Sequence, residues 1–203
     1  MNKDNKEISK ATLNRLPSYL KYLYQLDKLN VATVSSTTIA NGLNLNPVQV
    51  RKDIALVSSV AGKPKMGYVT KEIIADLESF LGYNNTHDAI LVGVGGLGKA
   101  FLGYGGFDNY GLNIVAAFDN NDRIINTKIN GKPVYDVAKL KEIVERFNIQ
   151  IGIITVPSYA AQEVADRMVN AGIKAIWNFA SVHLNIPSNI ALKNEDLASS
   201  LAL

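Results

Sequence analysis

Residues 89–98 read Ala-Ile-Leu-Val-Gly-Val-Gly-Gly-Leu-Gly, an apolar run that ends in a glycine-rich segment. Gly93, Gly95 and Gly98 have the spacing of the G-x-G-x-x-G turn that joins a strand to a helix. The first glycine permits the sharp bend, the second lets the backbone approach a pyrophosphate, and the third lets the helix pack close to the strand. The helix then presents its free N–H groups to the phosphates. We therefore expect a phosphate-binding turn followed by a helix over 97–104.

A carboxylate follows at the distance that a dinucleotide-binding unit requires. A second apolar strand is predicted over 114–118, and Asp119 ends it, 21 positions after Gly98 (119 − 98). In such units an acid about 20 positions beyond the turn accepts hydrogen bonds from the ribose hydroxyls. It would also repel a 2′-phosphate, so the pattern favours NAD over NADP. A glycine turn without a ligand, and Asp119 as a helix cap or a surface acid, are the alternatives.

Beyond residue 88, strands and helices alternate along the chain. This alternation predicts an α/β fold with a parallel sheet and crossover helices. Strands are expected over 89–92, 114–118, 133–135, 151–156, 175–178 and 189–192, and helices over 97–104, 136–147 and 158–171. The helix over 136–147 carries a stripe that we expect in the core: Val137, Leu140, Val144 and Phe147. Because parallel sheets bind ligands at the carboxyl ends of their strands, Pro157 and Asn178 are candidate site residues.

The first 83 residues have a different pattern, that of short helices. Pro17 suits the first turn of a helix, and Ser35 or Ser36 can cap a second one. After a tight turn at Gly42, Asn46 and Pro47 are a cap and a first helical residue. Two helices joined by a short glycine-containing turn are typical of a helix-turn-helix. We expect a winged helix-turn-helix domain over 1–83 and a Rossmann-like domain over 84–203.

The helix that begins at Pro47 is the predicted recognition helix. Its buried stripe comprises Val50, Ile54 and Val57, at spacing i, i+4, i+7. Its outward donors, and two lysines of a predicted hairpin wing over 62–68, are candidates for DNA contact: Gln49, Arg51, Lys52, Lys63 and Lys65. Ordinary solvated side chains are the alternative interpretation of these residues.

Composition places limits on the function. The 203-residue chain has 47% hydrophobic and 19% charged residues, as expected of a folded protein. It has no cysteine and two histidines far apart, so we expect neither disulfides nor a metal site. Residues 1–83 carry 11 basic and 7 acidic side chains (+4) and residues 84–203 carry 10 and 11 (−1), which sum to the net +3. We expect no membrane span and no signal peptide, and we expect a cytoplasmic location.

Five segments in order resemble the Rex family of redox-sensing transcriptional repressors. They are Ala11–Pro17, Val50–Asp53, Gly93–Gly98, Thr155–Pro157 and Trp177–Ala180. The resemblance implies a homodimer that binds a pseudo-palindromic operator on double-stranded DNA and releases it when NADH binds. It also implies roles in coupling the two domains for Arg15, Tyr104 and Asp196. With the patterns above, the predicted NADH/NAD-binding residues are Gly93, Val94, Gly95, Gly96, Leu97, Gly98, Phe118, Asp119, Thr155, Val156, Pro157, Asn178 and Phe179.

Three features depart from the family pattern. Residues 55–61 replace an aromatic and glycine-rich stretch that usually follows the recognition helix, which puts operator preference and affinity in question. Ser181 replaces a common proline. The chain ends at Leu203, soon after Asp196, so a C-terminal dimerisation helix exchanged between subunits would be short.

Two other functions remain open at this point. Thr155–Pro157 followed by 161–174 also resembles the CoA-binding domain of acyl-CoA synthetases, which predicts a CoA-binding regulatory protein. A small NAD-dependent oxidoreductase is the third possibility. It would need a second substrate and a positioned acid or base, and neither His87 nor His183 has a recognisable partner. We therefore expect a sensor with no catalytic residues rather than an enzyme.

Overall fold

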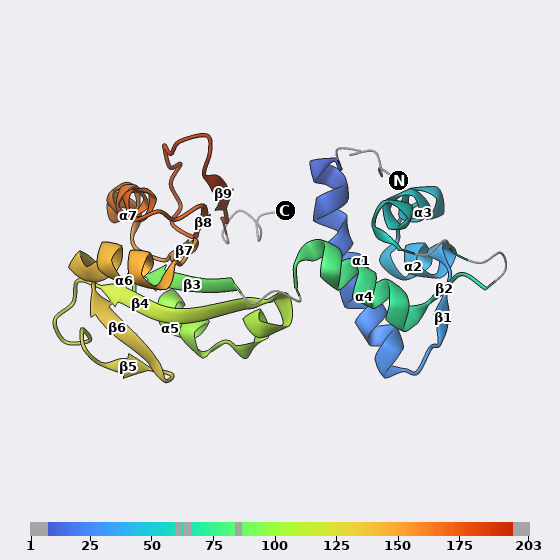
Figure 1. The fold of residues 1–203 in the computed structure, drawn as a ribbon, viewed down its shortest axis with the longest axis horizontal. Helices are drawn as coiled ribbons and strands as arrows, with labels where there is room; N and C mark the ends of the chain where they lie inside the picture. Colours follow the sequence, from blue (N-terminus) through green and yellow to red (C-terminus); the bar gives the residue numbers. More distant parts are fainter. Residues whose placement is uncertain (1–7, 60–61, 63–65, 84–86, 197–203) are drawn as a thin grey trace. The chain divides into compact units, whose positions relative to one another are not determined.

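The computed structural model describes residues 8–59, 62, 66–83 and 87–196. Internal contacts divide the chain into two compact units, Met1–Asn84 and Asn85–Leu203. Figure 1 shows a helical N-terminal unit and a C-terminal unit built around a sheet. Each unit has its own apolar core, and each is described by itself below.

The N-terminal unit consists of four helices and a two-stranded sheet. The helices are α1 (Lys10–Lys28), α2 (Ser36–Leu43), α3 (Pro47–Val57) and α4 (Thr70–Leu81). The antiparallel sheet pairs β1 (Thr33–Val34) with β2 (Tyr68–Val69). Ser35 caps α2 by accepting from the Thr38 N–H, and Asn46 caps α3 with Pro47 next to it, as the sequence predicts. The unit has the helix-turn-helix arrangement that was expected.

One local expectation in this unit is corrected. Pro17 lies inside α1 rather than in its first turn, because Ser9 caps that helix and accepts from the Thr12 N–H at 3.1 Å. The helix continues through the proline because Leu16, Leu20 and Leu23 bury one continuous apolar face. The predicted wing over 62–68 is described only in part: its Tyr68 belongs to β2, which pairs with β1, a strand that precedes α2. Lys63 and Lys65 lie outside the described residues.

The C-terminal unit has a seven-stranded sheet in the order β5-β6-β4-β3-β7-β8-β9. All neighbours are parallel except β5 and β6, so the predicted α/β class is confirmed. The strands are β3 (His87–Val92), β4 (Leu112–Asp119), β5 (Lys128–Ile129), β6 (Lys132–Asp136), β7 (Ile151–Ile154), β8 (Ala175–Asn178) and β9 (Ala191–Asn194). The predicted strand over 151–156 ends earlier, at Ile154, and the predicted strand over 189–192 lies two residues later.

Register aligns the carboxyl ends of the three central strands. Val92 of β3 pairs with Phe118 on one side and with Ile154 on the other. Ile154 in turn pairs with Asn178. The residues that follow these positions therefore emerge at one edge of the sheet. This edge is where an open α/β sheet binds its ligands.

Helices cover both faces of this sheet (Figure 1). On one face α6 (Leu140–Phe147) and α7 (Ser158–Asn170) pack on β3, β4 and β7, and on the other lies α5 (Gly96–Gly103). The predicted helix over 136–147 begins as a 3₁₀ turn, Val137–Lys139, and becomes α-helical only at Leu140.

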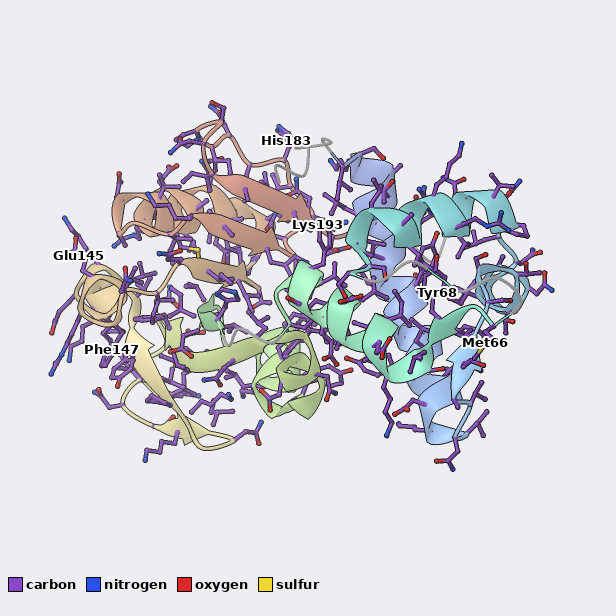
Figure 2. All side chains as sticks on the ribbon, turned by 45° about the vertical axis from the view of Figure 1, so that its right-hand side comes forward. Met66, Tyr68, Glu145, Phe147, His183 and Lys193 are labelled. Atoms are coloured by element: carbon purple, nitrogen blue, oxygen red, sulfur yellow. The ribbon has the colours of Figure 1, made fainter. Side chains whose placement is uncertain are left out.

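The expectation that Phe147 belongs to the core is wrong. This last residue of α6 is 61% exposed, and Figure 2 shows it at the outer surface of the unit. The guanidinium of Arg146 lies 5.6 Å from the centre of its ring. Leu140 and Val144, from the same predicted stripe, are buried. The stripe fails at its end because the helix stops there and the following residue, Asn148, has a left-handed conformation.

Candidate functional site

The glycine turn has a geometry that only glycine allows at two positions. Gly93 has φ +100°, and a Cβ there would lie 2.7 Å from Val156 Cγ1 and 2.8 Å from the carbonyl of Thr155. A Cβ on Gly98 would overlap the carbonyl oxygen of Gly93. Space in front of Gly95 is open, with no atom within 4 Å of the corresponding position. The first and third glycines therefore shape the turn, and the second leaves room for a ligand.

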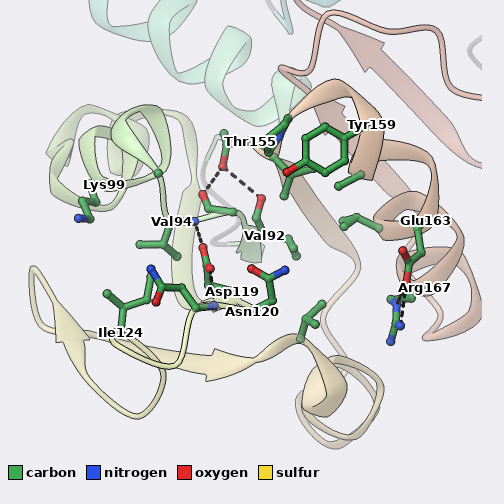
Figure 3. A pocket seen from close by; sticks show the side chains of 18 residues that line it. Val92, Val94, Lys99, Asp119, Asn120, Ile124, Thr155, Tyr159, Glu163 and Arg167 are labelled. Atoms are coloured by element: carbon green, nitrogen blue, oxygen red, sulfur yellow. Dashed lines mark hydrogen bonds and ion pairs between the residues drawn. The ribbon is translucent and has the colours of Figure 1, made fainter.

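Side chains from two neighbouring strand ends hold this turn in place. The Thr155 hydroxyl donates to the carbonyl of Gly93 at 2.7 Å and to that of Val92 at 3.2 Å. The Val94 N–H donates to Asp119 Oδ2 at 2.6 Å, and the Asn121 N–H donates to Oδ1 of the same carboxylate at 2.9 Å. Figure 3 shows these bonds. Asp119 thus links the turn to the loop that follows β4.

A cavity of about 500 Å³ lies beside the turn. Seven predicted residues line it: Gly93, Val94, Gly95, Asp119, Thr155, Val156 and Pro157. Its volume falls in the range of small-molecule and cofactor sites. Apolar side chains form much of the remaining wall, and these are Ile124, Val137, Ala160 and Val164. The cavity therefore combines the backbone of the glycine turn, a carboxylate and an apolar wall.

Six other predicted residues do not line this cavity. Gly96, Leu97 and Gly98 belong to α5 behind the turn, and Phe118 is fully buried in the core. Asn178 is also fully buried. Its amide nitrogen lies within hydrogen-bonding distance of the carbonyls of Ala180 and Val182 and of Asn194 Oδ1, and its oxygen accepts from the Ala180 N–H at 3.0 Å.

Phe179 packs inside an aromatic cluster instead of facing the cavity. Its ring centre lies 4.7 Å from that of Phe101 and 4.6 Å from that of Trp177. Asn178 ends β8 and Phe179 follows it, as the sequence predicts, but neither lines the cavity. The loop after β8 and the strand β9 then engage the amide of Asn178, so it organises this loop.

One wall of the cavity is formed by residues that were not predicted from the sequence. Tyr159, Glu163 and Arg167 of α7 all line it, and Figure 3 shows them on one side of the pocket. Their spacing, i, i+4, i+8, indicates a common helix face that runs from the N-cap of α7 at Pro157. Arg167 bonds Glu163 Oε1 through Nη2 at 2.8 Å. Lys99, Asn120 and Asn121 complete the polar lining.

The predicted DNA-contacting face of α3 is exposed. Gln49, Arg51 and Lys52 are all exposed, while Val50 and Ile54 on the opposite side have no accessible surface. The helix therefore offers a mixed amide and cationic surface, as expected of a recognition helix.

A buried carboxylate connects this helix to α1. Asp53 of α3 is 4% exposed, and it accepts from Arg15 Nε at 2.8 Å and from Nη2 at 3.0 Å. The Tyr19 hydroxyl donates to it at 2.7 Å and the Thr12 hydroxyl at 3.3 Å. Burial alone would raise the pKa of Asp53, but the hydrogen bonds from Arg15 and Tyr19 hold this pKa below its ordinary value. Burial, together with the bond to Asp53, raises the pKa of Tyr19 to about 12.

The raised pKa of Tyr19 makes the stability of the N-terminal unit depend on alkaline pH. An unfolded tyrosine ionises near pH 10, whereas the folded one keeps its proton to about pH 12. Between these values the unfolded state binds fewer protons, so the free energy of unfolding falls as pH rises. We expect denaturant titrations to show this loss, and a Tyr19→Phe variant to show a smaller one. Tyr159→Phe is the control because Tyr159 is 90% exposed; an unchanged slope in Tyr19→Phe would contradict the assignment.

The three residues expected to couple the domains lie in both units. Arg15 takes part in the Asp53 cluster of the N-terminal unit. Tyr104 follows α5 in the C-terminal unit, is 59% exposed, and meets Phe107 edge-on at 5.0 Å between ring centres. Asp196 lies just beyond β9. Their role in coupling stays a prediction.

The described residues contain no group of three or more His, Cys, Asp or Glu side chains arranged to hold a metal ion. Within the same residues, no helix combines the length and apolarity needed to cross a membrane.

Comparison with known proteins covers almost the whole chain. Residues 7–55 match a family described as putative DNA-binding protein N-terminus, and residues 84–182 match the CoA binding domain family. The redox-sensing transcriptional repressor Rex of Treponema denticola is 42% identical over 192 residues, which is 95% of this chain and 91% of the relative. The Rex repressor of Carboxydothermus hydrogenoformans is 42% identical over 195 residues, 96% of this chain and 93% of the relative.

The chain belongs to the Rex family. Solved structures agree with this assignment. RSP, a Rex-family repressor in complex with β-NAD⁺ and operator DNA, superposes with a TM-score of 0.92 at 36% identity, covering 98% of this chain and 91% of that one. RSP in complex with β-NADH gives a TM-score of 0.88 at 35% identity, covering 98% and 92%. The Rex resemblance inferred from the five sequence segments is thus confirmed, and the named Rex relatives are repressors rather than enzymes.

Proposed function

We propose that this Rex-family repressor binds a pseudo-palindromic operator as a homodimer and releases it when NADH occupies the cavity beside the glycine turn. One observation carries the proposal: a glycine turn braced by Thr155 and Asp119 beside a cavity belongs to the same chain as a helix-turn-helix with an exposed polar helix face. The RSP repressor, solved with NAD⁺ and operator DNA and with NADH, supports both ligands. A cytoplasmic location follows from this function.

The cavity residues fit a dinucleotide. Open space at Gly95 lets a pyrophosphate approach the backbone at the start of α5, where the free N–H groups of the helix point. Each oxygen of Asp119 accepts one backbone hydrogen bond, Oδ2 from the Val94 N–H and Oδ1 from the Asn121 N–H, and a carboxylate oxygen has capacity for a second, so ribose hydroxyls can still donate to it. The apolar wall suits a purine ring. NADH would act here as a sensed ligand, bound through these groups without reacting.

Release of DNA requires that NADH favour one arrangement of the protein. A ligand shifts an equilibrium only by the difference between its affinities for the two states. A coupling of about 3 kcal/mol corresponds to a roughly 150-fold change in operator affinity. By linkage, operator DNA must weaken NADH binding by the same factor.

Nucleotide titration against DNA binding tests the proposal. Duplexes selected by the purified protein from a randomised pool serve as the operator, and fluorescence anisotropy measures the dissociation constant. We expect NADH to weaken binding strongly and NAD⁺ to do so much less. Identical curves with and without NADH would overturn the sensing function, and failure to select any duplex would overturn the DNA-binding one.

Asp119 should determine the affinity for NADH and the rejection of NADPH. An Asp119→Ala variant is expected to bind NADH about tenfold or more weakly, since it loses a hydrogen bond to a charged group worth about 1.5–3 kcal/mol. It should also discriminate less against NADPH, because the charge that repels the 2′-phosphate is gone. Calorimetry measures both constants. Asp122→Ala, an exposed acid outside the cavity, is the matched control; equal effects of the two substitutions would refute the role.

CoA binding is a second candidate because residues 84–182 match the CoA binding domain family. The cavity could hold the diphosphate of either ligand at the glycine turn. The position of Asp119 favours a dinucleotide, because its carboxylate faces the place of an unphosphorylated ribose and would repel the 3′-phosphate of CoA. Calorimetric titration with NADH, NAD⁺ and CoA separates the two. Tight binding of CoA with no heat from NADH would replace the proposed ligand.

A further inference from the structure

The recognition helix α3 is held by carboxylates at two separate points. The first point is Asp53, in the middle of the helix, which faces α1. The second is the C-terminal end of the helix, where Ser58 and Ser59 meet Asp76 of α4. At these two points α3 contacts two different helices, α1 at the first and α4 at the second.

At the first point, all the donors come from α1. Arg15 contacts both oxygens of Asp53, and the hydroxyls of Tyr19 and Thr12 donate to them as well. Bidentate pairing of this kind fixes the orientation of the two groups as well as their separation. Only 5% of the Asp53 side chain is exposed, against 22% for Arg15. The cluster is therefore a directional attachment of α3 to α1.

At the second point, one oxygen collects three donors. Asp76 Oδ2 accepts from the Ser59 N–H at 2.7 Å, from the Ser59 hydroxyl at 3.0 Å and from the Ser58 hydroxyl at 3.1 Å. Ser58 caps α3, and its N–H donates to the Ile54 carbonyl. Ser58 and Ser59 belong to the 55–61 segment in which this chain departs from the family pattern. The serines thus attach the end of α3 to α4.

Apolar packing alone leaves two motions of α3 weakly restrained, rotation about its axis and translation along it. Val50 and Ile54 bury one side of α3, and such contacts have little directional preference. A helix held only by this stripe can roll about its axis or slide by a fraction of a turn at small cost. Base readout depends on where Gln49, Arg51 and Lys52 point, so a small roll matters for a specific sequence much more than for stability.

We propose that Asp53 and Asp76 are positioning residues that fix the orientation of α3 for sequence-specific DNA binding. The inference rests on the proposed DNA-binding function and extends it to two residues that do not face the DNA-contacting surface. Two directional attachments, one central and one terminal, prevent both roll and slide. They act through the helix and make no contact with the operator themselves.

Three variants separate positioning from stability. Asp76→Ala removes the terminal attachment from a half-buried site. The triple variant Asp53→Leu, Arg15→Met, Tyr19→Phe replaces the central cluster by apolar side chains, an exchange that in other proteins is often neutral or stabilising. Tyr24→Phe is the matched control, because the 2.6 Å bond that it removes joins α1 to Glu78 of α4.

The measurement is the ratio of affinities for the selected duplex and a scrambled one, at a fixed salt concentration. Melting temperature and NADH affinity are measured on the same samples. We expect the ratio to fall about tenfold in Asp76→Ala and by at least as much in the triple variant. NADH affinity should be unchanged in Asp76→Ala, and both variants should stay folded. The Tyr24→Phe control should keep the wild-type ratio.

Two results would overturn the inference. One is a wild-type affinity ratio in folded Asp76→Ala and in the folded triple variant. The other is an equal fall in the Tyr24→Phe control, which would indicate general loosening of the unit. If the triple variant unfolds, Asp76→Ala and the double variant Ser58→Ala, Ser59→Ala decide the question. Failure of the proposed function is distinguishable, because the wild-type protein would then select no duplex.

Discussion

A Gly98→Ala variant is expected to repress at every NADH concentration. The added methyl group overlaps the carbonyl of Gly93, so the start of α5 must move away from β3. The N–H groups that face the pyrophosphate then lose their alignment. Loss of two charge-assisted hydrogen bonds, each worth about 1.5–3 kcal/mol, weakens NADH binding on the order of 100-fold or more. Operator affinity without NADH should remain that of the wild type, because α3 belongs to the other unit.

Neighbouring glycines provide controls for this prediction. Gly96→Ala should bind NADH normally, since nothing lies within 4 Å of its added Cβ and the residue starts a helix. Gly95→Ala should leave the fold intact but lower the affinity for NADH, because its methyl group enters the space expected for the pyrophosphate. Calorimetry for NADH and anisotropy for the operator measure both effects. Normal NADH affinity in Gly98→Ala would mean that the ligand does not use this turn.

Removing both cations from α3 should abolish operator binding. An Arg51→Ala, Lys52→Ala variant is expected to bind the selected duplex on the order of 100-fold or more weakly, at about 1–3 kcal/mol for each lost base contact. If a side chain contacts phosphate instead, the slope of log K against log salt falls by about 0.9 for that residue. The salt dependence of each single variant therefore shows which cation reads bases.

Lys21→Ala is the control for the two cations. Lys21 is an exposed cation of α1, so it tests the effect of net charge alone. Its loss should change operator affinity only slightly. A comparable fall in Lys21→Ala would indicate general electrostatic attraction, and wild-type affinity in the double variant would exclude α3 as the recognition helix. NADH affinity should remain constant in all of these variants.

Several features were predictable because neighbouring residues decide them. A φ of +100° at position 93 favours glycine, so the residue type there indicates the turn. Asn46 and Pro47 likewise indicate the start of α3. Asp119 was predictable because the length of one strand–helix–strand unit places the acid at the end of the next strand. The exposed and buried faces of α3 follow from helical periodicity.

Other features depend on packing between distant segments. Phe147 continues an apolar stripe but is exposed, because α6 ends at that residue. Asn178 occupies the expected strand end, but β9 and the following loop engage its amide. Tyr159, Glu163 and Arg167 join the cavity only because α7 packs along it.

The sequence by itself determined the order of the two domains, the glycine turn after β3, the acid at the end of β4 and the polar face of α3. Each of these follows from backbone preferences and spacings that operate over one or two elements. Only the tertiary structure decided which side chains reach the cavity, and that Arg15 and Asp53, 38 positions apart, hold α1 to α3. A side-chain bond needs two segments at a fixed distance and angle, and that geometry arises only when the whole core has packed.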